Sequence, residues 1–378
     1  MSGIYIHIPF CKHKCNYCNF YSLASTRYMD QVTHALLSEL QQRKNYLQDE
    51  PVETIYFGGG TPSILKVSDI ENIISTVFKF YTVTANAEIT LEANPDDLTR
   101  EKLLALKNSG INRLSIGIQS FREEDLKYLS RTHSAGQVTR CIEDALQAGF
   151  HNLSIDFIYG IPTLTDEGWI ENLEKAQKYK IPHISAYSLT IEDKTPLEVM
   201  IRKGKMSPVD ESPALSHYHI LTRFMQQHGY EQYEVSNFCL PGNYSRHNTA
   251  YWQGKHYLGI GPSAHSYNGI SRSWNVAHLN KYIESVASGT VESEQELLST
   301  VTQLNEYIMT SLRTMWGCDL VAVGKKFGTE TAEKLLNNAL PFIESEQMKY
   351  LSGKLLLTPS GLLFADGISA ALFGEDKP

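Results

Sequence analysis

The chain has 378 residues, of which 42% are hydrophobic and 20% charged, and its formal net charge is −8 at pH 7. This composition is ordinary for a globular protein with a sizeable core, and the negative charge gives no support for nucleic-acid binding. The chain has no run of 18 apolar residues and no charged segment followed by an apolar one at its start, so neither a membrane-spanning nor a secreted protein is expected.

Short β-rich runs alternate with amphipathic segments from the start of the chain to about residue 205. The predicted strands are 3–8, 53–57, 88–92, 112–118, 152–158 and 183–189. The predicted helices are 27–45, 66–80, 99–109, 122–148 and 166–179. Strands that alternate with helices favour parallel βαβ units. Six such units predict an α/β fold with a partial (β/α)6 barrel, whose functional residues lie at the carboxyl ends of the strands.

After residue 205 this rhythm changes. A helix is predicted near 212–228, and three more near 300–316, 319–327 and 329–344, followed by a hairpin that turns at 352–354 and a closing helix from about Pro359. We therefore expect a barrel at 1–205, an extension of it at 206–298, and a smaller, mostly helical, winged-helix-like domain at 299–378. Lysines in the last domain are interspersed with glutamates, so a lid or partner-docking role is a better prediction for it than DNA binding.

Three cysteines follow the first predicted strand at the spacing C-x3-C-x2-C, namely Cys11, Cys15 and Cys18. Thiolates are soft ligands suited to iron–sulfur clusters, and a cubane cluster needs four ligands for full coordination by protein. Three cysteines would leave one iron open to bind a small molecule. The alternative is zinc, which would usually require a fourth cysteine or histidine close to such a pair, and His13 is awkwardly placed for that role.

The other cysteines, Cys141, Cys239 and Cys318, stand alone in apolar or mixed surroundings. This pattern fits a reducing cytosol, in which isolated cysteines serve as small buried side chains.

Polar or glycine-rich segments follow the other predicted strands. They are Gly58 to Pro62 after the second strand, Glu92 at the end of the third, Gln119 after the fourth, Asp156 in the fifth, and Tyr187-Ser188 in the sixth. Because the carboxyl ends of barrel strands meet at one mouth, we expect these residues to face the cysteine loop. Each also has a plainer interpretation: glycines serve tight turns, a strand-end carboxylate can cap the next helix, and an isolated arginine such as Arg131 is usually solvated.

Together these segments resemble a known family. The motifs YIHIPFCKHKCNYC, GGGTP, LEANP, GIQSF, LSRTH and DFIYGIP are similar to those of the coproporphyrinogen oxidase-like branch of the radical S-adenosylmethionine (SAM) superfamily, and the similarity covers most of the chain. The resemblance implies a [4Fe–4S] cluster on Cys11, Cys15 and Cys18, with SAM beside it. The SAM-contacting positions that it implies are Tyr5, Tyr17, Gly59, Gly60, Thr61, Glu92, Gln119, Arg131 and Asp156, with Ser188 and His265 in less similar surroundings.

That branch contains two kinds of protein: oxygen-independent coproporphyrinogen III oxidases of porphyrin biosynthesis, and heme chaperones. Oxidase-type sequences carry a further cysteine where this chain has Phe20, whereas the segment His247 to Trp252 matches the H-N-x-x-Y-W pattern of the chaperones. The chain also begins almost at the cluster motif, without the longer extension of the oxidases. The resemblance therefore favours a heme chaperone that delivers heme to respiratory hemoproteins. The oxidase is the alternative, so enzymatic activity is left open and no catalytic residue is assigned.

The heme site is predicted from one histidine. A neutral imidazole is a common axial ligand of heme, and His247 has the aromatic neighbours Tyr251 and Trp252. The alternative is a histidine that is hydrogen-bonded beside an aromatic cluster. The expected location is the cytoplasm, with peripheral contact to the inner face of the membrane and a homodimer both left open.

Overall fold

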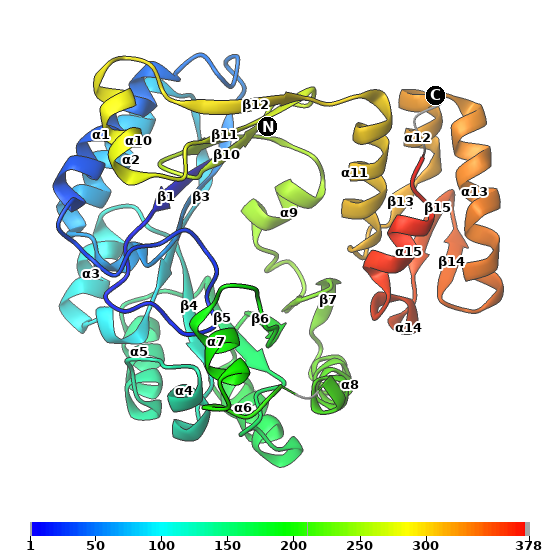
Figure 1. The fold of residues 1–378 in the computed structure, drawn as a ribbon, viewed down its shortest axis with the longest axis horizontal. Helices are drawn as coiled ribbons and strands as arrows, with labels where there is room; N and C mark the ends of the chain where they lie inside the picture. The colour runs from blue at the N-terminus through cyan, green and yellow to red at the C-terminus, as the bar shows by residue number, and fades with distance from the viewer. Residues whose placement is uncertain (1, 210, 375–378) are drawn as a thin grey trace.

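Strands β1 to β6 form the parallel centre of the fold, with helices on their outer side (Figure 1). The structure, a computed structural model, describes residues 2–209 and 211–374. The strands are β1 (Ser2–Ile8), β2 (Val52–Gly59), β3 (Val83–Ala93), β4 (Arg113–Gln119), β5 (Leu153–Tyr159) and β6 (His183–Ser188). The helices between them are α1 (Met29–Gln42), α2 (Val67–Phe80), α3 (Arg100–Asn108), α4 (Glu123–Tyr128), α5 (Ala135–Gln147) and α6 (Asp166–Lys178). The predicted partial α/β barrel is confirmed.

The two faces of these strands differ in character. In the register of β1 and β2, Ile4 lies opposite Ile55, and both are fully buried in the main hydrophobic core. The next pair, Tyr5 and Tyr56, faces the other way because successive side chains of a strand point to opposite sides. On β3 the same alternation buries Leu91 and turns Glu92 inward. The helix-facing side is thus apolar, and the inner side carries polar groups.

One predicted helix is wrong in its extent. The segment 122–148 forms two helices, α4 and α5, separated by residues 129–134. Ser130 has a φ of 54° there, in the left-handed region that interrupts a helix. Ser134 then starts α5 with a capping box, in which its side chain accepts from the backbone N–H of Gln137 and the Gln137 side chain accepts from the backbone N–H of Ser134. Apolar periodicity continues through the break, so it could not reveal the interruption.

The region after β6 extends the sheet on both sides. Helices α7 (Pro196–Arg202) and α8 (Glu211–Gln227) lead to β7 (Glu231–Glu234) and β8 (Asn237–Cys239), and β8 pairs antiparallel with β6. Strand β9 (His256–Ile260) pairs parallel with β1, and β10 (His265–Tyr267), β11 (Ser271–Asn275) and β12 (Ser293–Leu297) continue outward from it. Helix α10 (Leu279–Ala287) lies beside α1. Within the described residues the sheet has twelve strands.

Helix α9 (Arg246–Trp252) lies within the curve of this sheet, where it contacts β1 and β2 (Figure 1). It carries the H-N-x-x-Y-W segment. The side chain of Glu88 on β3 accepts hydrogen bonds from the backbone N–H groups of Arg246 and His247, at 3.0 and 3.3 Å, and so holds the start of the helix in place.

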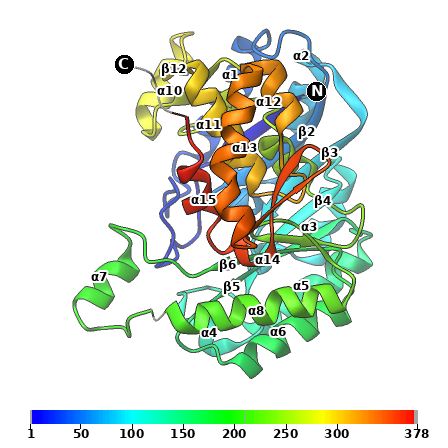
Figure 2. The same ribbon diagram turned by 90° about the vertical axis from the view of Figure 1, so that its right-hand side faces the viewer.

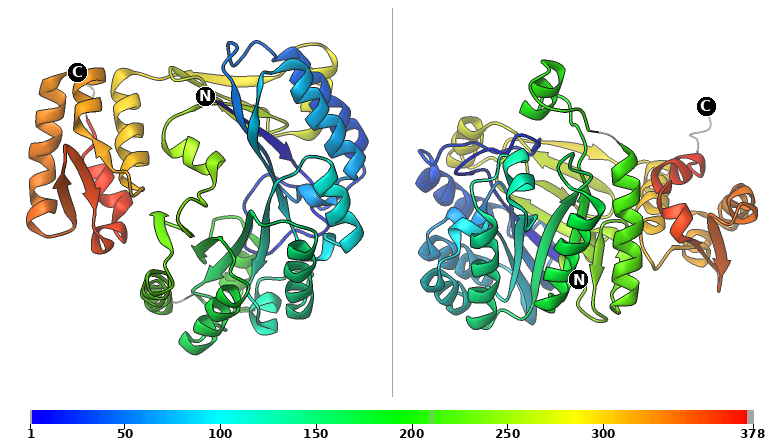
Figure 3. Two further views of the ribbon diagram at one scale, coloured as in Figure 1. Left: turned by 180° about the vertical axis from the view of Figure 1, so that it is seen from behind. Right: turned by 90° about the horizontal axis from the view of Figure 1, so that it is seen from below.

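The C-terminal part packs around a core of its own beside the barrel (Figures 2 and 3). Its helices are α11 (Thr300–Leu312), α12 (Leu320–Phe327), α13 (Thr329–Glu344), α14 (Pro359–Leu362) and α15 (Ala365–Ala371). Its sheet pairs β13 (Cys318–Asp319) and β14 (Met348–Leu351) with β15 (Lys354–Leu357). The hairpin is where it was predicted, but the predicted closing helix is two short helices. The three-part domain division stays a prediction.

No helix among the described residues has both the length and the apolar character needed to cross a membrane.

Candidate cofactor-binding site

The cysteine loop leaves the carboxyl end of β1 and is closed at its base by backbone hydrogen bonds. The N–H of Cys11 donates to the carbonyl of Leu23 at 3.0 Å, and the N–H of Leu23 donates to the carbonyl of Pro9 at 2.8 Å. Within the loop, the N–H of Cys18 donates to the carbonyl of Cys15 at 3.3 Å. These bonds keep the cysteines at the mouth of the barrel.

The three thiols fit an iron–sulfur cluster by chemistry and by placement. Cys11 is buried, whereas Cys15 and Cys18 are partly buried, and all are free of disulfides. Burial, together with the nearby thiols of Cys15 and Cys11, raises the pKa of Cys18. A metal cluster would remove that cost, because it binds thiolates and offsets their charge. Among the described residues, no three His, Cys, Asp or Glu side chains are arranged to hold a single metal ion.

Arg131 connects the cysteine loop to the barrel. Its Nη1 donates to Sγ of Cys15 at 3.3 Å and to the hydroxyl of Tyr17 at 3.4 Å. Its Nη2 donates to Oδ1 of Asn94 at 2.6 Å and to the carbonyl of Gly117 at 2.8 Å. The structure therefore does not support the alternative of a solvated arginine. The Nε of Arg131 is buried and has no hydrogen-bond partner among the described residues.

The segment around α7 (Pro196–Arg202) packs against the cysteine loop at Asn16. The N–H of Leu197, at the start of α7, donates to the carbonyl of Asn16 at 2.9 Å, and the Asn16 side chain donates to the carbonyl of Tyr128 at 2.8 Å. Leu197 is fully buried and Asn16 is only 4% exposed, although α7 projects from the body of the molecule (Figure 2). Asn16, which lies between two cysteines, thus joins the loop to α4 and α7. This role could not be predicted from the sequence, because one asparagine in a loop carries no pattern.

The glycine run at the end of β2 is required by close packing against β1 and the residues that follow it. Gly59 has a φ of 108°, and a Cβ there would lie 2.6 Å from the ring of His7. A Cβ at Gly60 would lie 2.5 Å from the carbonyl oxygen of Phe10. Close packing against the first strand and the residues after it is therefore sufficient to require these glycines, and their contact with SAM stays a prediction. The next residue, Thr61, is buried, and its Oγ1 accepts from the Asn94 side chain at 3.4 Å.

Glu92 and Asp156 lie on the inner face of the barrel. Glu92 accepts hydrogen bonds from the hydroxyl of Tyr56 at 2.8 Å and the N–H of Gly59 at 3.2 Å, and Asp156 accepts from the hydroxyl of Ser115 at 3.3 Å. Burial, and secondarily the charge of Asp156, raises the pKa of Glu92 to about 7, and burial raises the pKa of Asp156 to about 6. These partners lie on β2 and β4 and not at the start of a helix, so the structure does not support the alternative that either carboxylate caps the next helix.

Behind these carboxylates lies a buried arginine that sequence analysis missed. Arg113, at the start of β4, is 1% exposed, and its Nε lies 3.9 Å from a carboxylate oxygen of Glu88. Its positive charge acts with burial to lower the pKa of His247, and it also acts to lower the pKa values of Asp156 and Glu92. An arginine at a strand start looks like a surface residue in the sequence. The signal in the sequence is the spacing of Arg113 and Ser115 on β4. Residues two positions apart on a strand point to the same face, so Arg113 shares the inward face of Ser115.

The remaining predicted SAM positions lie around this mouth and inner face. Gln119 ends β4 in the left-handed region with a φ of 64° and is buried. Ser188 ends β6 and is partly buried. The hydroxyl of Tyr5 hydrogen-bonds with Nδ1 of His7 at 3.2 Å. His265 is exposed on β10, where its ring stacks on Trp274 and its backbone packs against Gly259 of β9.

His247 is held in a network that occupies both nitrogens of its ring. Nδ1 hydrogen-bonds with the Thr54 hydroxyl at 2.7 Å, and Nε2 with the Tyr251 hydroxyl at 2.8 Å. The ring stacks on Tyr56, with centroids 4.9 Å apart, and is 2% exposed. Burial, followed by the charge of Arg113, lowers the pKa of His247 to about 3, so the imidazole is neutral. His247 therefore matches the alternative of a histidine that is hydrogen-bonded beside an aromatic cluster. It could bind heme iron only if one of its two ring hydrogen bonds were replaced.

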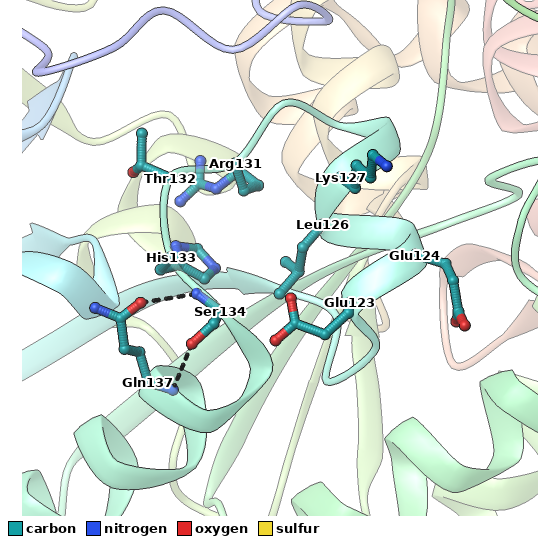
Figure 4. Close-up of a pocket in the computed structure, with 9 residues that line it drawn as sticks. All are labelled: Glu123, Glu124, Leu126, Lys127, Arg131, Thr132, His133, Ser134 and Gln137. Carbon is teal, nitrogen blue, oxygen red and sulfur yellow. Dashed lines mark hydrogen bonds between the residues drawn. The ribbon is translucent and has the colours of Figure 1, made fainter.

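A hollow of about 430 Å³ lies on the outer side of the α4–α5 junction (Figure 4). Arg131 and His133 line it, together with Glu123, Ser134 and Gln137. Glu123 accepts from the backbone N–H of Ala135 at 2.7 Å, and Nε2 of His133 hydrogen-bonds with the carbonyl of Ile118 at 3.1 Å. These contacts serve the start of α5 and the end of β4, whereas Nε of Arg131 and Nδ1 of His133 have no hydrogen-bond partner among the described residues.

Comparison with known proteins gives consistent results. Residues 5–176 match the family model of the radical SAM superfamily. The chain is 32% identical over 377 residues to the heme chaperone HemW of Mycobacterium tuberculosis, covering 98% of this chain and 95% of the relative. It is 32% identical over 379 residues to the heme chaperone HemW of Bacillus subtilis, covering 99% and 100%. The structure of coproporphyrinogen III oxidase (HemN) from Escherichia coli, a radical SAM enzyme, superimposes with a TM-score of 0.84 over 98% of this chain and 90% of that one, at 22% identity, which establishes the common fold.

Proposed function

The chain belongs to the HemW family within the radical SAM superfamily, and from that premise we propose that it is a heme chaperone that carries a [4Fe–4S] cluster and SAM in its partial barrel. One observation carries this proposal: the identity of 32% extends over nearly the full length of two heme chaperones, including the segment that forms α9. The resemblance in fold to HemN supports the barrel but does not separate a chaperone from an oxidase.

We propose Cys11, Cys15 and Cys18 as the cluster ligands. When bound, a cluster with one open iron can hold a small molecule and supply an electron to it. The chain's own contribution is to position the loop. Arg131 places a positive charge 3.3 Å from Sγ of Cys15, and Asn16 fastens the loop beneath α7.

The proposed SAM site is the mouth that this loop shares with the ends of β2 to β6. Glu92 and Asp156 would bind the ribose hydroxyls, as acidic residues do in nucleotide sites. With a pKa near 7, Glu92 can be protonated or ionised at neutral pH, so it can donate or accept a hydrogen bond there. The proposed roles of Tyr5, Tyr17, Gln119, Ser188 and His265 rest on the family resemblance and on their positions around this mouth.

Heme is the proposed cargo, and respiratory hemoproteins are the proposed recipients. His247 stays a candidate axial ligand, but its two short hydrogen bonds favour a structural role. A cytoplasmic location, contact with the inner face of a membrane and a homodimer also stay predictions.

The rival function is oxidative decarboxylation of coproporphyrinogen III. Phe20, at the position where oxidases carry a further cysteine, is 66% exposed beside the cluster loop and offers no ligand chemistry. This residue is the observation against the oxidase.

One paired experiment tests the proposal. Anaerobically reconstituted protein is titrated with heme, and the same preparation is incubated with coproporphyrinogen III, SAM and a reductant. Stable heme binding without protoporphyrinogen formation is the expected result. Sustained decarboxylation, or a failure of the reconstituted protein to retain heme, would overturn the chaperone function.

A further inference from the structure

A second cavity, of about 330 Å³, lies where the barrel meets the C-terminal part of the chain. It is lined by Tyr187 near the end of β6, by the β7–β8 hairpin, by α9, and by Arg313, which follows α11. Its volume is at the lower end of the range for small-molecule sites. Neither the proposed cluster site nor the proposed SAM site uses these side chains.

Several polar atoms around this cavity lack a partner. Asn237 is 4% exposed and donates through its Nδ2 to Glu234, but its Oδ1 has no hydrogen-bond partner within the described part of the chain. The same is true of Nε1 of Trp252 and Nε of Arg313. Because buried polar groups are nearly always hydrogen-bonded, their gathering on one cavity indicates a site for a polar ligand.

The charges around the cavity favour an anion. The guanidinium of Arg313 lies over the ring of Trp252, with its Cζ 5.6 Å from the ring centroid. Arg313 also pairs with Asp366, whose side chain is 81% exposed, and an ion pair with so exposed a partner contributes little and is readily exchanged. The other charged residue, Glu234, is turned toward its own hairpin, where it accepts from Asn237 and from the N–H of Ser236. Arg313 is thus the group that can receive a ligand carboxylate.

The walls of the cavity are aromatic. Tyr187 and Tyr251 line it together with Trp252, and flat aromatic faces suit the edge of a flat ligand. We propose that this cavity binds one carboxylate-bearing edge of a heme, with Arg313 pairing with a propionate and Trp252 donating a hydrogen bond to it. This inference rests on the proposed function, and it gives α9 and the C-terminal part of the chain a shared role in holding the cargo.

The test compares heme with heme dimethyl ester, in which both propionates are neutralised. Each is titrated into the full-length reconstituted protein and followed by absorbance. Wild type is expected to bind heme at least about ten-fold more tightly than the ester, as a charge-assisted hydrogen bond allows. Arg313→Gln should abolish this preference with unchanged cluster content. Trp252→Phe, which keeps an aromatic ring but removes the N–H, should reduce the preference and serves as a second variant.

Arg272→Gln is the matched control. Arg272 also tethers the C-terminal part of the chain, through an ion pair with Glu306 at 2.8 Å, but it does not line the cavity. This variant should retain the preference for heme. If wild type binds heme and ester equally, or if Arg313→Gln keeps the preference, the inference is overturned while the chaperone function stands. If wild type binds neither compound, the proposed function itself fails.

Discussion

Replacing His247 by Ala is expected to destabilise the barrel whether or not heme is present. The substitution removes the hydrogen bonds to Thr54 and Tyr251, at 2.7 and 2.8 Å, from a site that is 2% exposed. Each lost bond costs about 1 kcal/mol, and the unfilled space beside Tyr56 adds about 1–2 kcal/mol. The expected loss is about 3 kcal/mol in the free energy of unfolding.

The assay is urea unfolding of the heme-free protein under reducing conditions, followed by circular dichroism. His247→Asn can keep the bond to Thr54, and His247→Gln can keep the bond to Tyr251, so each should recover about half of the loss. His265→Ala is the control: that histidine is exposed, and its replacement should change the free energy of unfolding by no more than about 0.5 kcal/mol. An unchanged stability of His247→Ala, combined with an altered heme spectrum in all three His247 variants, would refute the structural role and restore His247 as the heme ligand.

Three further predictions concern the cluster and SAM sites. The triple variant of Cys11, Cys15 and Cys18 to Ala should fold but form no iron–sulfur chromophore on anaerobic reconstitution; a chromophore of normal intensity would rule out this ligand set. Arg131→Lys keeps the charge but not the four contacts of the guanidinium, so SAM affinity measured by equilibrium dialysis should fall by roughly ten-fold, and an unchanged affinity would contradict the assignment. Burial raises the pKa of Glu92 to about 7 in the folded protein, above its ordinary value of 4.5, so its contribution to stability is present below pH 4.5 and is lost as the pH rises through 7. Glu92→Gln should therefore be more stable than wild type at pH 8, by up to about 3 kcal/mol, and should lose this advantage at pH 4.5, as urea unfolding at the two pH values would show.

Much of the fold could be predicted from the sequence because its signals are local. Alternating strands and helices indicated the parallel barrel, and the apolar and aromatic residues of the first segment indicated the strand that became β1. The break between α4 and α5 was not predictable from periodicity, since the backbone reversal at Ser130 is a matter of dihedral angles. The parallel pairing of β9 with β1 joins residues about 250 positions apart, and no local pattern records such a contact.

For the site, the sequence by itself determined the kinds of chemistry that the chain can perform. The spacing of three cysteines and the polar residues at strand ends are properties of neighbouring positions, so they could be recognised directly, and full-length similarity then placed the chain in its family. Only the tertiary structure decided how far each side chain is already committed to partners within the protein. It showed that both nitrogens of His247 are hydrogen-bonded, that Arg113 is buried, and that Arg313 lies over the ring of Trp252 beside a cavity. Burial and hydrogen bonding depend on residues distant in sequence that packing brings together, and those two quantities decide whether a histidine or an arginine is free to bind a ligand.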